Sequence, residues 1–368
     1  MPDSTDVFVI GGGPAGLAAA IAARREGLSV MVADGCRPPI DKACGEGLMP
    51  DGLAALAKLG VEIGGAQAHP FRGIRFLGCG VSVEADFPSG PGLGIRRTVL
   101  HGIMAGHAER AGVSLRWGTR VEGIGEGWVL AGGAKVRCRW IVGADGGFSR
   151  VRRWAGLEAA AREGRRYGFR KHYRIAPWSS HMELHWGADN QVYVTPVAAD
   201  EVCVAVVSSD PRLRLDRALE GFPELAARLL RAETASAMRG AVTARRRLKA
   251  VCGGRVALIG DASGSVDAIT GEGLSIAFQQ AAALAGAMAA GDLAGYQAAH
   301  RRLARRPEIM AALLLAMGSR AFLRRRALHA LASKPAMFSK MLAGHVGCLS
   351  PAGMAAAGLS LGWRLLKP

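Results

Sequence analysis

The sequence predicts an α/β protein with a nucleotide-binding domain built on a parallel sheet, an inserted β-rich domain and a helical C-terminus. Three observations support this prediction. Residues 6–34 have the strand, glycine-rich turn, helix and strand of one βαβ unit. Residues 167–208 alternate apolar and polar side chains with the period of a strand. Past residue 300, apolar and basic positions recur at helical spacing.

Length and composition indicate a folded protein with a large core and without a disulfide framework. A chain of 368 residues, of which 50% are hydrophobic, can bury a large core and has room for two connected subdomains. The seven cysteines are scattered and form no C-x-x-C pair, which argues against a disulfide framework and against a zinc site. We therefore expect no metal centre and a reducing, cytoplasmic setting.

The first element is the N-terminal segment "DVFVIGGGPAGLAAAIAARREGLSVMVAD". "VFVI" predicts a buried strand, the alanine-rich run a helix ending at Gly27, and "LSVMVA" a second strand. The first glycine of G-x-G-x-x-G permits a tight turn, the second lets the backbone approach a pyrophosphate, and the third lets the helix pack on the strand. The predicted dinucleotide-binding residues of this turn are Gly11, Gly13, Pro14, Ala15 and Gly16.

Asp34 completes the nucleotide-binding pattern. It ends the second strand roughly 20 residues beyond the turn, where a carboxylate accepts hydrogen bonds from an adenosine ribose. The free N–H groups at the start of the helix face the phosphates. This pattern predicts a dinucleotide but does not distinguish NAD from FAD.

Three later motifs favour FAD. In residues 139–156 the strand "WIVGAD" delivers Asp145 to a turn before a helix. In residues 254–288 the strand "VALIGD" ends in Asp261, and a long apolar helix begins near Gly273. Arg97 stands at the start of a third helix. A carboxylate at a strand end can bind a ribityl hydroxyl, and the N–H groups at a helix start can face the pyrimidine side of a flavin.

Together these motifs resemble the flavoprotein superfamily of class A aromatic hydroxylases and geranylgeranyl reductases, which share the p-hydroxybenzoate hydroxylase fold. "GADGGFSRVRR" is similar to the DG fingerprint of that superfamily, and "GDASGSVDAITGEG" to its GD motif. The resemblance spans residues 6–288 and implies a Rossmann-like FAD-binding domain of the glutathione reductase type. It implies noncovalent FAD, with NAD(P)H as a transient reductant that has no Rossmann domain of its own.

The resemblance also implies roles for individual residues. Asp261 is expected to hold the ribityl chain, Arg97 to contact the flavin chain, and Asp145 to belong to a motif tied to both FAD and NAD(P)H. The alternative for Asp145 is a turn former, with Ser149 as the cap of the next helix. The residues expected beside the isoalloxazine are Gly271, Gly273 and Leu274.

The motifs set the predicted domain boundaries. Strand-like segments between them are expected to form a sheet over the flavin, with an apolar substrate pocket. The FAD-binding domain comprises residues 1–70, 95–165 and 250–300, the β-rich substrate domain residues 71–94 and 166–249, and the basic helical segment residues 301–368.

The stretch "KACGEGLMP", residues 42–50, resembles the C-G-x-G-L loop of geranylgeranyl-reductase-like proteins. Cys44 is expected to be a small residue beside the cofactor. A chemical role is the alternative, for which Lys42 is the one local cation and is expected to be solvated. Glu46 is a candidate to orient the substrate or donate a proton. The alternative for Glu46 is a carboxylate facing a helix start.

The strand "HMELHW" places His181, Glu183 and His185 on one face. The order is not H-E-x-x-H, so we expect a solvated strand face rather than a metal site. A degenerate aromatic element follows at residues 192–198, where geranylgeranyl reductases have a fuller one.

The motifs are compatible with two different reactions. The DG fingerprint and the degenerate aromatic element favour a monooxygenase that uses NAD(P)H and O2 on a hydrophobic, aromatic or polyketide-like molecule. "CGEGL" and "TGEGL" favour the alternative, a reductase of C=C bonds in an isoprenoid or related lipid. A third hypothesis, a noncatalytic nucleotide or nucleic-acid binder, predicts protein without bound flavin.

The net charge of +17 is concentrated at the C-terminal end, where twelve lysines and arginines follow residue 300 against Glu308 alone. No nucleic-acid-binding signature accompanies it. We expect a small hydrophobic substrate, carrier-bound or membrane-associated, and contact of the basic segment with the inner face of a membrane. No window reaches the roughly 18 to 20 apolar residues of a spanning helix, and no secretory signal precedes "DVFVIGGG".

Overall fold

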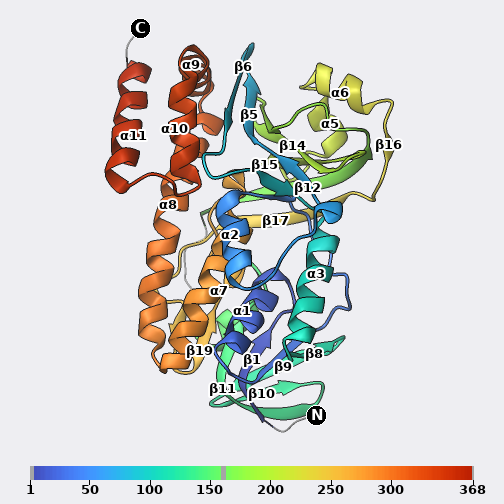
Figure 1. Cartoon of the computed structure of the whole chain (residues 1–368), viewed down its shortest axis with the longest axis vertical. Coiled ribbons are helices and arrows are strands. Elements are labelled where there is room, and N and C mark those ends of the chain that lie inside the picture. The colour runs from blue at the N-terminus through green and yellow to red at the C-terminus, as the bar shows by residue number, and fades with distance from the viewer. Residues whose placement is uncertain (1–3, 159–162, 367–368) are drawn as a thin grey trace.

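The computed structural model describes residues 4–158 and 163–366. Figure 1 shows the nucleotide-binding domain at the bottom, a second sheet with two short helices at the upper right, and the C-terminal helices along the left side. The predicted combination of an α/β nucleotide-binding domain, a β-rich domain and a helical C-terminus is confirmed.

The first sheet belongs to the nucleotide-binding domain. Its strands are β1 (Ser4–Ile10), β2 (Val30–Asp34), β8 (Ser114–Trp117), β9 (Val121–Gly125), β10 (Trp128–Ala131), β11 (Ala134–Gly143), β18 (Cys252–Gly253) and β19 (Val256–Leu258). The order β19, β11, β1, β2, β8 is parallel throughout. The carboxyl ends of β1, β2, β11 and β19 therefore meet at one edge, where ligands of such sheets bind.

Helices cover this sheet and follow its strand ends. They are α1 (Pro14–Arg25), α2 (Pro50–Lys58), α3 (Arg97–Arg110), α4 (Arg150–Trp154) and α7 (Gly273–Ala290). The predicted βαβ unit is confirmed. The boundaries of its two strands and its helix agree with the prediction within two residues, except that β1 begins three residues earlier, at Ser4. The predicted helix starts at Arg97 and Gly273 are also confirmed.

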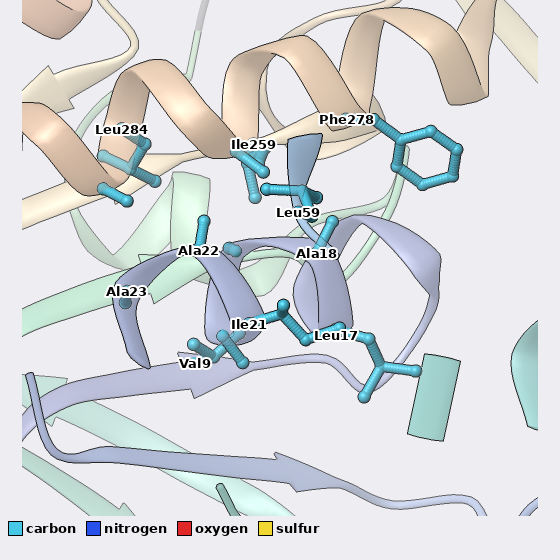
Figure 2. Close-up of a cluster of buried hydrophobic side chains, with 14 of the residues drawn as sticks. Val9, Leu17, Ala18, Ile21, Ala22, Ala23, Leu59, Ile259, Phe278 and Leu284 are labelled. Atoms are coloured by element: carbon cyan, nitrogen blue, oxygen red, sulfur yellow. The ribbon is translucent and has the colours of Figure 1, made fainter. Parts of the chain in front are cut away.

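Close packing of α1 against α7 forms the core of this domain. Figure 2 shows Ala18 and Ala22 of α1 turned towards α7, and Leu17 and Ile21 turned towards the strand that carries Val9. All five side chains are buried. The alanines leave room for α7 to approach, while the larger side chains fill the space above the sheet. Each buried leucine or isoleucine contributes about 1.5–3 kcal/mol.

The second sheet is the β-rich domain. Its strands are β5 (Gly73–Gly78), β6 (Val81–Asp86), β12 (Glu163–Arg174), β13 (Met182–Trp186), β14 (Asn190–Ala198), β15 (Glu201–Ser208), β16 (Glu233–Thr234) and β17 (Arg239–Arg245). A small third sheet joins the domains through β3 (Gly47–Leu48), β4 (His69–Phe71) and β7 (Gly92–Gly94). Helices α5 (Leu215–Leu219) and α6 (Pro223–Leu229) cover one end of the second sheet.

The C-terminal segment consists of α8 (Leu293–Ser319), α9 (Ala321–Ser333), α10 (Pro335–His345) and α11 (Pro351–Leu366). The predicted boundary at residue 300 falls inside α8, which runs unbroken from the nucleotide-binding domain to the second sheet (Figure 1). Helices α9 and α10 pack against β6, and Leu328 and Phe338 share a core with Phe76 of the second sheet.

Helix α7 is long and apolar enough, by length and composition, to cross a membrane. The expectation that no window reaches this length is therefore wrong for residues 273–290. Phe278, Leu284 and Met288 are nonetheless buried in the protein core beside α1. Core helices pass the same test, so the finding is weak evidence for a membrane span.

Candidate functional site

A single cavity of about 1440 Å³ joins the two domains. Its walls come from the strand ends of the first sheet, one face of the second sheet and the first half of α8. All the residues predicted from sequence to bind the cofactor line it except Gly16, and Cys44 and Glu46 line it as well. The volume exceeds the roughly 300–1,000 Å³ of a typical ligand site. It therefore has room for a dinucleotide and an apolar substrate side by side.

The glycine-rich turn shows which of its glycines shape the fold and which face the cavity. A Cβ on Gly16 would overlap the carbonyl oxygen of Gly11, and a Cβ on Gly11 would overlap that of Ala144. Gly11 also has a φ of 110°, which side chains rarely adopt. Gly13 is different, because the nearest atom to an added Cβ is an Arg97 nitrogen 3.9 Å away. Gly13 thus presents open backbone to the cavity.

Asp34 supports the turn from the second strand. Its carboxylate accepts hydrogen bonds from the backbone N–H of Gly12, at 2.7 Å, and of Cys36, at 2.7 Å. The Trp117 ring packs so closely on Gly12 that any side chain there would overlap it. A carboxylate oxygen has two lone pairs, so Asp34 can still accept from a ribose at the cavity wall. That contact stays a prediction.

Asp145 caps a helix. Its carboxylate accepts from the Ser149 hydroxyl at 2.5 Å and from the backbone N–H groups of Arg150 and Val151 at 2.6 and 3.1 Å. Ser149 in turn accepts from the N–H of Arg152 at 2.9 Å. The structural alternative for Asp145, a turn former with Ser149 as the cap, is therefore confirmed. Because Asp145 also lines the cavity, a role beside the cofactor remains open to it.

Asp261 lies in a short 3-10 turn directly after β19. Its carboxylate is 3.0 Å from the Lys42 ammonium, and both side chains are about half exposed. Lys42 was expected to be solvated, and its side chain is indeed exposed, although it also forms this ion pair. Such an exposed pair is weak, so a ribityl hydroxyl can compete for Asp261.

Several features fit FAD at this site. An added Cβ on Gly271 or Gly273 would meet no atom within 4 Å, so the start of α7 offers bare backbone to a flat ring. The Nε of Arg97 is buried without a hydrogen-bond partner. A buried orphan donor is costly, and an acceptor on a ligand in the cavity would satisfy it. Bound FAD would supply the redox chemistry, and these residues would hold it.

Glu46 is a buried residue of the cavity wall with an unusual backbone conformation. It is 2% exposed and has a φ of 59°, a conformation uncommon for residues other than glycine. Its Oε1 accepts from the backbone N–H of Arg97 at 2.9 Å, so it does face a helix start, that of α3. Its Oε2 lies 2.6 Å from Nε2 of His172. Strained conformations of this kind cluster at functional sites.

Two further groups surround this carboxylate. Arg170 NH2 lies 3.6 Å from Glu46 Oε1 and also pairs with Asp41. The Cys203 thiol lies close enough for Glu46, His172 and Cys203 to form a set of potential metal ligands. Burial raises the pKa of Cys203 well above its usual value, which disfavours the thiolate that a metal needs. The expected absence of a metal stays a prediction.

Cys44 has contacts typical of a structural residue. Its sulfur accepts from the backbone N–H of Glu46 at 3.4 Å, and its carbonyl accepts from the Cys203 thiol at 3.8 Å. Lys42, the cation considered as its activator, pairs with Asp261 instead. The geometry thus favours Cys44 as a small residue of the cavity loop.

The strand face with His181, Glu183 and His185 was expected to be solvated, and this expectation is wrong. Glu183 is 3% exposed, because Arg75 pairs with it from β5 at 3.3 Å and the Trp178 indole donates to it at 3.1 Å. His185 completes its contacts at 3.1 Å.

A second buried polar cluster lies behind the start of α7. Glu272, between the two cavity glycines, is 1% exposed, and its Oε1 is 3.5 Å from Arg306 of α8. Arg306 is closer to Asp51 of α2, at 2.9 Å. His345 of α10 lies 3.6 Å from Glu272 Oε2. Burial raises the pKa of Glu272 to about 8 and lowers that of His345 to about 4.

Sequence motifs missed the contribution of α8 to the cavity. His300 and Arg305 line it beside the GD turn, and His300 Nε2 lies 2.9 Å from the Ser263 hydroxyl. Burial lowers the pKa of His300 to about 4, so the ring is neutral near pH 7. The motifs also missed Arg170 and His172, because nothing local marks a residue of β12 as a partner of Glu46.

Comparison with known proteins gives a family match and related enzymes. The family described as the FAD binding domain matches residues 4–303. The menaquinone reductase of Mycobacterium tuberculosis is 33% identical over 328 residues, covering 79% of this chain and 78% of the relative. The digeranylgeranylglycerophospholipid reductase of Methanosarcina acetivorans is 34% identical over 175 residues, 44% and 42% of the two chains. The 6-methylpretetramide 4-monooxygenase of Streptomyces rimosus is 36% identical over 172 residues, 42% and 41%.

Solved structures confirm the fold. A flavoprotein/dehydrogenase from Cytophaga hutchinsonii superposes with a TM-score of 0.82 over 96% of this chain and 95% of its own, at 17% identity. At that identity the likeness concerns the fold alone. It extends through the β-rich domain and most of the C-terminal helices, beyond the part that the sequence motifs cover.

Proposed function

Since this chain belongs to the FAD-binding-domain family and is an FAD-dependent oxidoreductase, we propose that it reduces a carbon–carbon double bond in an isoprenoid lipid of the menaquinone kind. The observation that carries the proposal is the extent of similarity. The menaquinone reductase matches over more than three quarters of both chains, whereas the monooxygenase matches over less than half. A relative that shares both the cofactor region and the substrate region is the better guide to the substrate.

The cavity supports a reductase. Beyond the cofactor residues its wall includes an apolar part, with Met49 from the loop before α2 and Met182, Tyr193 and Val207 from the second sheet. Such a wall suits an isoprenoid chain. Saturating a double bond requires a hydride on one carbon and a proton on the other. Reduced FAD supplies the hydride when bound, and we assign the proton to Glu46, the buried carboxyl of the cavity wall.

NAD(P)H is the proposed source of electrons, used transiently. The first test is spectroscopic. Under nitrogen, NADH or NADPH is expected to bleach the flavin absorbance of the FAD-loaded protein. Adding menaquinone in detergent is then expected to restore the absorbance without oxygen. A matched control uses menaquinone whose side chain has been fully hydrogenated, which reports quinone-ring reduction alone.

The monooxygenase remains the second candidate, favoured by the DG fingerprint and by the 6-methylpretetramide 4-monooxygenase relative. It predicts the opposite oxygen dependence. The lipid would leave the flavin reduced under nitrogen, and product carrying an added oxygen atom would form in air. That outcome would replace the reductase proposal.

We also propose that the C-terminal helices contact the cytoplasmic face of a membrane, from which a lipid substrate comes. The cations Arg320, Arg325, Lys334 and Lys340 are exposed there, and Phe322 is 66% exposed. Helix α11, beside α9 and α10 in Figure 1, carries Arg364 as its one charged residue. Basic groups beside exposed apolar ones are typical of interfacial helices. We expect no nucleic-acid partner.

Vesicle flotation tests this contact. The protein is expected to float with vesicles of mixed neutral and anionic phospholipid and to remain behind with purely neutral ones. Changing Arg320, Arg325, Lys334 and Lys340 to glutamate is expected to reduce binding at least tenfold, because each basic residue near an anionic surface contributes about 1 kcal/mol. The control is Arg137→Glu, an exposed position on β11 in the nucleotide-binding domain. Equal losses in both variants would contradict the proposal.

A further inference from the structure

A chain of three polar side chains leads from the cavity wall towards the surface. Glu46 lines the cavity, and its Oε2 is 2.6 Å from Nε2 of His172. The other ring nitrogen, Nδ1, is 2.7 Å from the Ser236 hydroxyl. Glu46 and His172 are each 2% exposed, whereas Ser236, in the segment between β16 and β17, is half-buried. The chain thus connects a buried acid with the solvent side of the β-rich domain.

We propose that Ser236 and His172 form a proton relay that recharges Glu46 from solvent after each reduction. This inference rests on the proposed function, in which Glu46 is the acid. His172 and Ser236 do not line the cavity, so they act through Glu46 as positioning and transfer groups.

The donors and acceptors around His172 assign its tautomer. The Ser236 oxygen accepts from the backbone N–H of His172 at 3.2 Å, so its own proton is free to point at Nδ1. Arg170 also donates towards Nδ1, at 3.4 Å, and a guanidinium has no acceptor. Nδ1 therefore accepts, and the ring proton lies on Nε2, directed at Glu46. Every hydrogen in the chain then points inwards, from the surface towards the cavity.

The proton balance follows from this arrangement. One carbon of the double bond gains a hydride, with both electrons, from reduced FAD, and its neighbour gains the Glu46 proton. The Glu46 carboxylate that remains takes the proton on His172 Nε2. Nδ1 takes the Ser236 proton, and Ser236 is reprotonated by water. Reorientation of the imidazole and the hydroxyl then restores the starting tautomer before the next turnover. A histidine with a partner on each nitrogen is suited to such a transfer.

The charged side chains around the relay are Arg170, Arg239 and Asp41. From β12, Arg170 faces both Glu46 and His172, and its own charge is balanced by Asp41. From β17, Arg239 also pairs with Asp41, at 3.2 Å. Arg170 is therefore shared between Asp41 and Glu46.

The remaining neighbours of Glu46 come from α3 and β15. The backbone N–H of Arg97 holds Glu46 Oε1, which leaves Oε2 for the relay. Arg96, at the start of α3, is paired with Glu201 of β15. Cys203 of β15 also faces Glu46, and burial raises its pKa, so it stays an uncharged thiol. No described neighbour offers Glu46 a second route for its proton exchange as short as the His172 contact.

The test compares His172→Gln, Ser236→Ala and Ser236→Thr with wild type in anaerobic reoxidation of the flavin by menaquinone. A general acid contributes about 10²–10⁴-fold in rate. We expect His172→Gln to slow the reaction at least tenfold and to abolish the solvent deuterium isotope effect of the relay. Ser236→Ala is expected to slow it severalfold, and Ser236→Thr, which keeps a hydroxyl, to recover the lost rate.

A second readout uses protein without FAD. With ¹⁵N-labelled histidine, the His172 resonances are expected to show a protonated Nε2 and an accepting Nδ1, and Ser236→Ala is expected to shift Nδ1 alone. A protonated Nδ1, or an active wild type matched in rate and isotope effect by His172→Gln, would overturn the relay while leaving the reductase. A wild type that reduces no lipid would overturn the proposed function and the relay together.

Discussion

Replacing Glu272 with glutamine is expected to stabilise the protein at pH 9 and to leave its stability nearly unchanged at pH 4. The cause is that the buried Glu272 and the partly buried Asp51 share one cation, Arg306. Arg306 lies 2.9 Å from Asp51 and 3.5 Å from Glu272, so Asp51 has the better partner. Burial then raises the pKa of Glu272 from 4.5 to about 8.

The direction of the effect follows from proton binding. Between pH 4.5 and about pH 8 the folded protein keeps the Glu272 proton and the unfolded chain releases it. Stability is therefore fully present below pH 4.5 and falls as the pH rises through this window. Each unit of pKa corresponds to about 1.4 kcal/mol, so the glutamine variant is expected to gain roughly 3–5 kcal/mol at pH 9. His345, whose lowered pKa costs stability below pH 6.5, is present in both proteins and cancels.

Urea unfolding at half-unit steps from pH 4 to pH 9 measures this difference. The control is Glu62→Gln, an exposed glutamate beyond α2, which is expected to change little at any pH. If the curves of Glu272→Gln and wild type run parallel over the whole range, Glu272 is ionised in the folded protein and the account of the cluster is wrong.

Gly16→Ala is expected to destabilise the nucleotide-binding domain by about 3 kcal/mol or more and to abolish FAD binding. A Cβ on Gly16 would overlap the backbone carbonyl of Gly11 and contact the Ala144 side chain at 3.2 Å. Backbone at a turn between β1 and α1 cannot move aside without shifting the strand end. The turn predicted to hold the phosphates would then open.

Gly286→Ala is the matched control, because this glycine also lies in a core helix, α7, but an added Cβ meets no atom within 4 Å. It is expected to gain about 0.5–1 kcal/mol from helix propensity. Thermal melting and the flavin content of the purified proteins measure both effects. A Gly16→Ala protein that melts with wild type and retains its FAD would contradict the close contact of Gly16 with the Gly11 carbonyl.

The cofactor side of the site was predictable because each of its motifs is local. Asp34, Asp145 and Asp261 follow the strands β2, β11 and β19, and a parallel sheet brings such strand ends together at one edge. For each of these aspartates, the sequence of one strand and the turn after it is enough to predict its position at that edge. The structure accordingly gathers these residues around one cavity.

The contacts of the buried carboxyl groups were less predictable, because their partners lie far apart in sequence. Glu46 and His172 are 126 positions apart and meet only when the second sheet packs on the loop before α2. Glu272 and His345 meet only because α10 packs back against the start of α7. No local pattern marks such pairs. The burial of Glu183 was missed for the same reason, since its partner Arg75 comes from another strand.

The most direct test of the proposed reductase is the mass of the lipid product. FAD-loaded protein, NAD(P)H and menaquinone are incubated under nitrogen, the lipid is extracted, and air is admitted to reoxidise any quinol. The account predicts a product that retains two added hydrogens after air oxidation, because a saturated double bond is not reoxidised. Recovery of unchanged menaquinone, with loss of the added hydrogens in air, would show reduction of the ring alone and contradict the proposal.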